Sequence, residues 1–166
     1  MVRSDQPEVL ETYRARYESR PPQRASATSN EDVHLSTSDG VEYLHVAPCE
    51  HSQHGEPPLE RGGGTNTHLW VIDEDGIPYI LEQPAERIGQ SPKHTNLAMR
   101  AHAGGELWFR DSKSITISGG SGRFPPRSAE ELELIAEVFR SYEYKTQSLG
   151  WDAETQTPLR HQQILK

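Results

Sequence analysis

A chain of 166 residues, of which 33% are hydrophobic, is expected to form one domain with part of its length outside the core. Its net charge of −8 argues against a broad surface for nucleic acids or anionic membranes, although it suits a basic protein partner. The single cysteine excludes an internal disulfide, and no membrane-spanning or signal-peptide segment is evident. We therefore expect a cytoplasmic protein, or one exported without a conventional signal peptide.

The first part of the chain is expected to be polar and partly irregular. Apolar residues at helical spacing within residues 8–17 predict a short amphipathic helix, which a Pro-Pro pair ends. Residues 23–40 and 47–67 have the polar composition of loops, and a short strand is expected between them at 41–46. Residues 1–67 thus read as an N-terminal helix and a polar linker region.

The strongest structural pattern begins at His68. Residues 68–82 predict a β-hairpin, because two β-favouring runs flank an Asp-Glu-Asp-Gly turn. Residues 106–118 predict a second hairpin, and residues 144–149 a further strand. A capping box at Ser128 and Glu131 starts the one strong helix. Its apolar stripe, expected to face the sheet, consists of Leu132, Ile135, Val138, Phe139 and Tyr142.

These elements predict an α+β fold, with an antiparallel sheet and one main packed helix. The compact core is expected at residues 68–152, followed by a polar tail at residues 153–166.

The candidate functional residues lie in a glycine-rich stretch in the second half of the chain. His94 and Glu106 supply an imidazole and a carboxylate, the minimum for general acid–base chemistry, and we assign them as the catalytic candidates. The ligand-binding candidates are Asn96, Ser121, Gly122 and Arg123. In this second group, an anion could bind to the backbone N–H groups of the glycine-rich loop before the helix and to the guanidinium of Arg123.

A purely structural interpretation stands beside each assignment. The Gly119-Gly120 pair would then only turn the chain from strand to helix, and Glu106 would pair with an arginine such as Arg100. For His102, a structural role is favoured. Cys49, His51 and His54 have ligand types that suit Zn²⁺, but the usual fourth ligand is missing, so no metal site is assigned.

Taken in order, four sequence blocks resemble a sparsely characterised family found in plant calmodulin-binding IQ-motif proteins and in bacterial toxin or effector regions. The blocks are Asp73 to Gly76, His94-Thr95, Gly105-Glu106 and 121–126 (SGRFPP), which together span less than half the chain. The resemblance implies a shared fold and a site formed by His94, Glu106 and the loop at Ser121. Arg123 and Phe124 replace the family's His and Tyr, so proton transfer by those two side chains is not available here.

These residues and the resemblance lead to two alternative functions from different classes. The first is a bacterial effector- or toxin-like domain that handles a small anionic or nucleotide-type ligand, as in a transferase such as an ADP-ribosyltransferase. NAD or another nucleotide would be its cofactor, Glu106 would stabilise a developing cation or act as a base, and Arg123 would hold a phosphate. The second is a non-catalytic acidic immunity or regulatory module that binds a basic protein. Convergence of His94 and Arg123 beside Glu106 would favour the first.

Overall fold

The computed structural model describes residues 6–23, 30, 32–47 and 57–160. The order of elements along the chain is α1 (Glu8–Arg16), η1 (Thr37–Asp39), β1 (Glu42–Tyr43), β2 (His68–Ile72), β3 (Pro78–Leu81), α2 (His94–Leu97), β4 (Ala103–Asp111), β5 (Ser114–Ser118), α3 (Ala129–Ser141), β6 (Lys145–Ser148), β7 (Trp151–Asp152) and β8 (Thr157–Pro158).

Six strands form one sheet in the order β1-β3-β2-β4-β5-β6. The predicted α+β class with one main helix is confirmed, and the pairings from β1 to β5 are antiparallel as expected. Strand β6 differs, because it runs parallel to β5. The reason is that α3 lies between these two strands in the chain and carries it back along the sheet, as a crossover helix does. The sheet is therefore mixed.

The predicted hairpin turn between β2 and β3 is formed by local hydrogen bonds. The Asp73 Oδ1 atom accepts from the backbone N–H groups of Asp75, at 2.8 Å, and Gly76, at 3.0 Å. Gly76 has a φ of +148°, which only glycine adopts without strain. The Asp-Glu-Asp-Gly sequence thus specifies this turn through both its first and its last residue.

Strand β4 begins three residues before the predicted hairpin, because Gly104 and Gly105 belong to the sheet. Both glycines pair with β2, at the centre of the ladder. A Cβ atom on Gly105 would lie 2.0 Å from the Ser118 carbonyl oxygen and 2.6 Å from Cζ2 of Trp70. The glycine is therefore required by close packing within the sheet, and the pair does not form an irregular segment.

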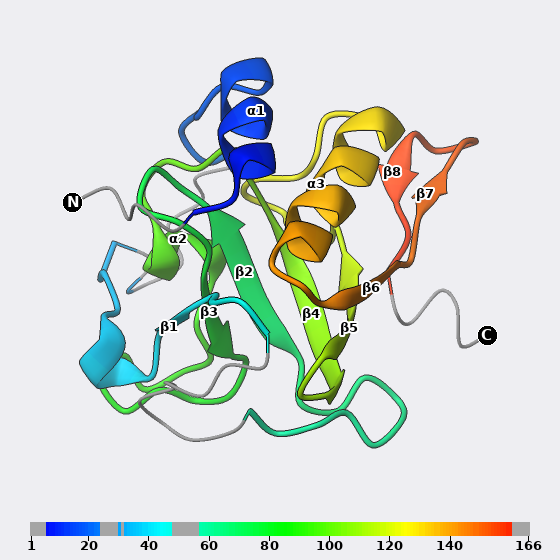
Figure 1. The fold of residues 1–166 in the computed structure, drawn as a ribbon. Coiled ribbons are helices and arrows are strands. Elements are labelled where there is room, and N and C mark those ends of the chain that lie inside the picture. The colour runs from blue at the N-terminus through cyan, green and yellow to red at the C-terminus, as the bar shows by residue number, and fades with distance from the viewer. Residues whose placement is uncertain (1–5, 24–29, 31, 48–56, 161–166) are drawn as a thin grey trace.

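Helices α1 and α3 lie side by side over one face of the sheet (Figure 1). The apolar stripe of α3 is buried as predicted, and Phe139 meets the ring of Trp70 edge-on at 5.2 Å between centroids. The predicted capping box forms only in part. Ser128 Oγ accepts the Glu131 N–H at 3.1 Å, but the Glu131 carboxylate instead accepts from the Tyr13 hydroxyl at 2.6 Å.

The core draws on residues from both sides of His68. Leu10 and Tyr13 of α1, together with Leu44, belong to the cluster between the helices and the sheet. On the opposite face, a second cluster includes Leu35 and Val41 with residues of β2, β3 and α2, as well as Phe124. Beyond β6, β7 and β8 pair antiparallel in a small two-stranded sheet, so β8 of the predicted polar tail pairs with the last two residues of the predicted core.

Candidate functional site

A cavity of about 300 Å³ opens on the sheet face opposite α1 and α3. Its described lining consists of Gly63, Gly64, Thr67, Glu82, Glu106, Trp108 and Arg160. The size is at the lower end of the range for small-ligand pockets. Strand β4 contributes Glu106 and Trp108 to its floor, and Thr67, just before β2, and Glu82, just after β3, complete the described polar lining beside it.

The Glu106 carboxylate is held at the floor of this cavity by its neighbours on β5. Glu106 is directly opposite Ser118 in the ladder, and the Ser118 hydroxyl donates to Glu106 Oε1 at 3.1 Å. A Cβ atom on Gly120 would lie 2.9 Å from the same Oε1 and 3.5 Å from Cγ of Arg160. The second glycine of the Gly119-Gly120 pair therefore leaves room for an anionic and a cationic side chain to approach each other.

One wall of the cavity is a glycine loop fixed by a buried carboxylate. Gly62, Gly63 and Gly64 all have positive φ values, which other residues rarely adopt. The Glu60 side chain is fully buried, accepts the Gly64 N–H at 3.0 Å and forms an ion pair with Arg110. The wall is thus tied to β4 through one ion pair.

Thr67 and Trp108 join this wall to the floor. The Thr67 hydroxyl donates to the Gly64 carbonyl oxygen at 2.7 Å and accepts from the Trp108 indole N–H at 2.8 Å. The polar groups of both side chains are therefore committed to shaping the cavity.

Glu82 brings a second carboxyl group to the cavity. Glu82 is an exposed residue, yet the protein around its carboxyl raises its pKa by desolvation, an effect that the charge of Lys93 partly offsets. Among the described residues, none donates a hydrogen bond to this carboxyl group. Glu82 therefore differs from Glu106, whose ionised form the Ser118 hydroxyl stabilises.

His94 lies against the same face of the sheet as the cavity, but the described lining of the cavity does not include it. Its Nε2 atom is 2.8 Å from the carbonyl oxygen of Gly105 and therefore carries the proton. Burial lowers the pKa of His94 to about 4, against the opposing effect of that hydrogen bond, and the charges of Arg160, Arg123 and Lys93 lower it further. At neutral pH the imidazole is uncharged and supports the backbone of β4.

Ser121 lies next to His94, on the same side of Gly104. A Cβ atom on Gly104 would lie 3.0 Å from Cδ2 of His94 and 3.3 Å from Oγ of Ser121. Ser121 Oγ accepts the backbone N–H groups of Arg123, at 3.3 Å, and Phe124, at 2.9 Å, so it shapes the loop before α3. Gly122 is exposed, and Arg123 is close enough for its charge to act on His94.

Asn96 has a structural position. Its side chain is completely buried, its Oδ1 accepts the Lys93 N–H at 2.8 Å, and its Nδ2 donates to the carbonyl oxygens of Asn30 and Val33. The residue joins α2 to the chain before β1, with no polar group left for a ligand.

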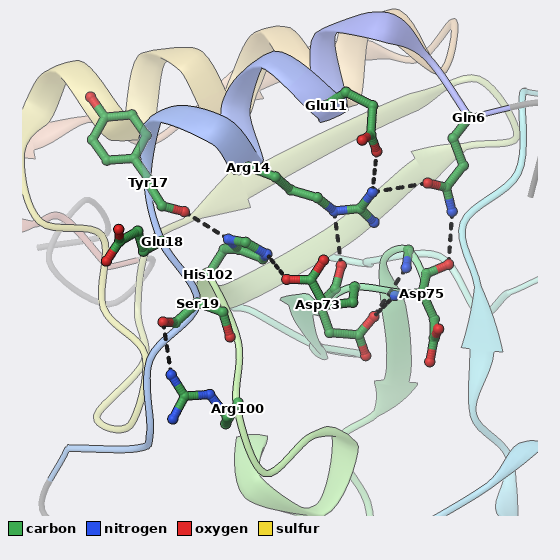
Figure 2. Close-up of polar contacts among 12 residues, drawn as sticks. Gln6, Glu11, Arg14, Tyr17, Glu18, Ser19, Asp73, Asp75, Arg100 and His102 are labelled. Atoms are coloured by element: carbon green, nitrogen blue, oxygen red, sulfur yellow. Dashed lines mark hydrogen bonds and ion pairs between the residues drawn. The ribbon is translucent and has the colours of Figure 1, made fainter. Parts of the chain in front are cut away.

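His102 also has a structural role, and it lies on the other side of the molecule from the cavity. Figure 2 shows its ring between the end of α1 and the β2–β3 turn. Its Nδ1 atom lies 2.7 Å from the Tyr17 carbonyl oxygen, and its Nε2 atom lies 2.9 Å from Glu74. Arg127 donates to the His102 carbonyl oxygen at 3.2 Å. His102 therefore joins α1 to the sheet and lies apart from Glu106.

His94 and Ser121 lie beside Gly104, on the same face of the sheet as Glu106, and the charge of Arg123 acts on His94. Of these four residues, only Glu106 is in the described lining of the cavity. Sequence reasoning missed Glu82 and Arg160 of the lining. No local pattern marks those two residues, because only the sheet register and the path of the last described residues bring them together.

Among the described residues, no group of three or more His, Cys, Asp or Glu side chains is arranged to hold a metal ion. Cys49, His51 and His54 lie outside the described residues. No helix in the described part of the chain is long and apolar enough to span a membrane.

Comparisons with protein-family models, with curated proteins and with solved structures found no match to this chain.

Proposed function

We propose that the protein is a bacterial effector- or toxin-like domain that binds a small, nucleotide-type anionic ligand in the cavity beside Glu106. The observation that carries this proposal is the meeting of Glu106 and Arg160 around Gly120, at the floor of a cavity large enough for a small molecule. The resemblance of the His94, Glu106 and Ser121 blocks to effector regions supports the same assignment.

The cavity supplies the groups that a transferase of this kind needs. Arg160 offers a guanidinium to a phosphate, and the charge of Arg123, which acts on the neighbouring His94, adds positive potential. Glu106 offers a fixed carboxylate to a hydroxyl group or to a cation that develops during group transfer, as in ADP-ribosyl transfer from NAD. The uncharged His94 acts here as a positioning residue, since it binds the Gly105 carbonyl next to Glu106.

A thermal-shift screen of nucleotides, NAD and phosphosugars tests this proposal. A ligand of the folded state stabilises it by about 2.7 kcal/mol at a concentration of 100 times Kd. The stabilisation should disappear in Glu106→Gln, which keeps the side-chain volume, and in Gly120→Ala, whose new Cβ displaces the Glu106 carboxylate. Glu133→Gln, on the exposed face of α3, is the matched control and should behave as the wild type.

Either of two results would contradict the proposal. One is a screen in which no compound raises the melting temperature. The other is a compound that stabilises wild type, Glu106→Gln and Gly120→Ala equally, since such a compound binds elsewhere.

A second candidate function is an acidic immunity or regulatory module for a basic protein. It is favoured by the exposed carboxylates on the adjacent helices α1 and α3, namely Glu8, Glu11, Glu133 and Glu137. Binding through this surface would weaken steeply with added salt and with Gln substitutions at these four positions, whereas Glu106→Gln would leave it unchanged.

A further inference from the structure

Two carboxyl groups in the cavity oppose the binding of an anionic ligand at neutral pH. The described lining of the cavity holds two carboxyl groups, on Glu82 and Glu106, and one guanidinium, on Arg160. If both carboxyl groups are ionised, they weaken the attraction that Arg160, with the charges of Lys93 and Arg123 nearby, exerts on an anion. Protonation of one carboxyl group would reduce this effect and supply a hydrogen-bond donor.

The surroundings of the two carboxyl groups decide which one takes the proton. The Ser118 hydroxyl donates to Glu106 at 3.1 Å, and this bond favours the ionised carboxylate. No described group donates a hydrogen bond to Glu82. Desolvation by the protein around Glu82 disfavours its charged form, and this effect is larger than the opposing effect of Lys93.

The other charged groups near Glu82 come from each element that meets the cavity. Lys93 precedes α2, Glu106 belongs to β4, and Arg160 follows β8. Behind the glycine wall, the negative charge of Glu60 is compensated by its ion pair with Arg110. An anion that binds at Arg160 therefore acts most directly on Glu82 and Glu106, and it raises the proton affinity of both.

We propose that Glu82 is the proton-accepting residue of this cavity, so that one proton from solvent is taken up by its carboxylate when an anionic ligand binds. The neutral carboxyl group then donates a hydrogen bond to the ligand, while Glu106 stays ionised and accepts one. This inference rests on the proposed function. It describes the ligand as a compound that places an anionic group at Arg160, a hydrogen-bond acceptor at Glu82 and a hydroxyl group at Glu106.

The test is calorimetric titration with NAD, whose pyrophosphate charge is constant between about pH 5 and about pH 8. In the wild type, the affinity should fall by up to about tenfold per pH unit once Glu82 ionises. Titrations in two buffers of different ionisation enthalpy should show uptake of up to one proton per ligand bound. Glu82→Gln, whose amide also donates a hydrogen bond, should bind NAD with nearly constant affinity over the same range and more tightly than the wild type at about pH 8.

Glu86→Gln, an exposed change on the same segment, is the matched control and should keep the wild-type pH dependence. If NAD binds the wild type with no pH dependence, or if the dependence persists in Glu82→Gln, the proton-linked role of Glu82 is wrong and the proposed ligand site stands. If NAD binds neither protein at about pH 5, both the inference and the assignment of NAD to this cavity are overturned.

Discussion

The glycine at position 105 provides the sharpest test of the packing described above. Gly105 lies in the centre of β4, where its missing side chain allows Trp70 and the backbone of β5 to approach. In Gly105→Ala, the new Cβ would lie 2.0 Å from the Ser118 carbonyl oxygen and 2.6 Å from Cζ2 of Trp70. The oxygen belongs to backbone, so no flexible side chain can move aside.

The size of the effect follows from these distances. Atoms in ordinary van der Waals contact are about 3.5 Å apart, so β4 and β5 must separate by about 1 Å or more. Hydrogen bonds of roughly 2.9 Å between the strands do not survive such a movement, and each is worth about 1 kcal/mol. With about 1–3 kcal/mol for overpacking against Trp70, we expect a loss of about 3 kcal/mol or more in the free energy of unfolding.

Urea-induced unfolding, followed by tryptophan fluorescence, measures this loss directly. Gly122→Ala is the matched control, because a Cβ there meets nothing within 4 Å and Gly122 does not have a positive φ. That variant should be as stable as the wild type, or more stable by up to about 1 kcal/mol, because alanine restricts the unfolded chain. A Gly105→Ala protein within about 1 kcal/mol of the wild type would show that β4 and β5 are not packed as described.

Three further predictions concern α3 and two buried histidines. Phe139→Ala should lower the free energy of unfolding by about 3–5 kcal/mol, because a fully buried ring against Trp70 is lost; a change below about 0.5 kcal/mol in a urea melt would mean that the helix is misplaced. Ser128→Ala should cost about 1 kcal/mol through loss of the cap on α3, and Ser128→Asp, which restores a capping oxygen, should recover most of it in the same assay. Burial lowers the pKa of both His68 and His94 from 6.5 to about 4. Between these two pH values the unfolded chain therefore binds more protons than the folded one. The free energy of unfolding should fall as the pH falls through this window, by at most about 3 kcal/mol for each residue. His94→Gln and His68→Gln should each flatten the plot of stability against pH, and an unchanged slope in both would contradict their burial as neutral rings.

The parts of the fold that sequence predicted correctly are those specified by neighbouring residues. The turn between β2 and β3 depends on Asp73 and Gly76, which are three residues apart, and the stripe of α3 depends on a period of 3.6 residues. In both cases, the interacting groups lie within one or two turns of chain, where local spacing determines geometry.

The parts that sequence did not predict depend on contacts between distant segments. Tyr13 enters the core because its hydroxyl reaches Glu131, 118 residues further along the chain. Gly105 lies against Trp70 only because the register of β4 with β2 places it there. A local pattern cannot show which residue lies opposite another in a sheet.

The candidate site shows the same division. The sequence selected Glu106 because a carboxylate beside a glycine pair stands out, and this residue does line the cavity. The sequence could not show that the His94 imidazole is hydrogen-bonded to the Gly105 carbonyl oxygen of β4. Nor could it show that Glu82 and Arg160 join Glu106, since three separate segments must first assemble.

Arg160 is synthesised after all the other described residues of the cavity lining, and this order has a consequence for how the protein folds during synthesis. The glycine wall, Glu82 and Glu106 all leave the ribosome before Arg160, which contributes the only described guanidinium of the cavity lining. A nascent chain that has folded β2 to β5 therefore holds the two carboxyl groups without this cation. If the proposed anionic ligand binds at Arg160, its capture must wait until synthesis has passed that residue, and the ligand cannot serve as a template for the earlier folding steps.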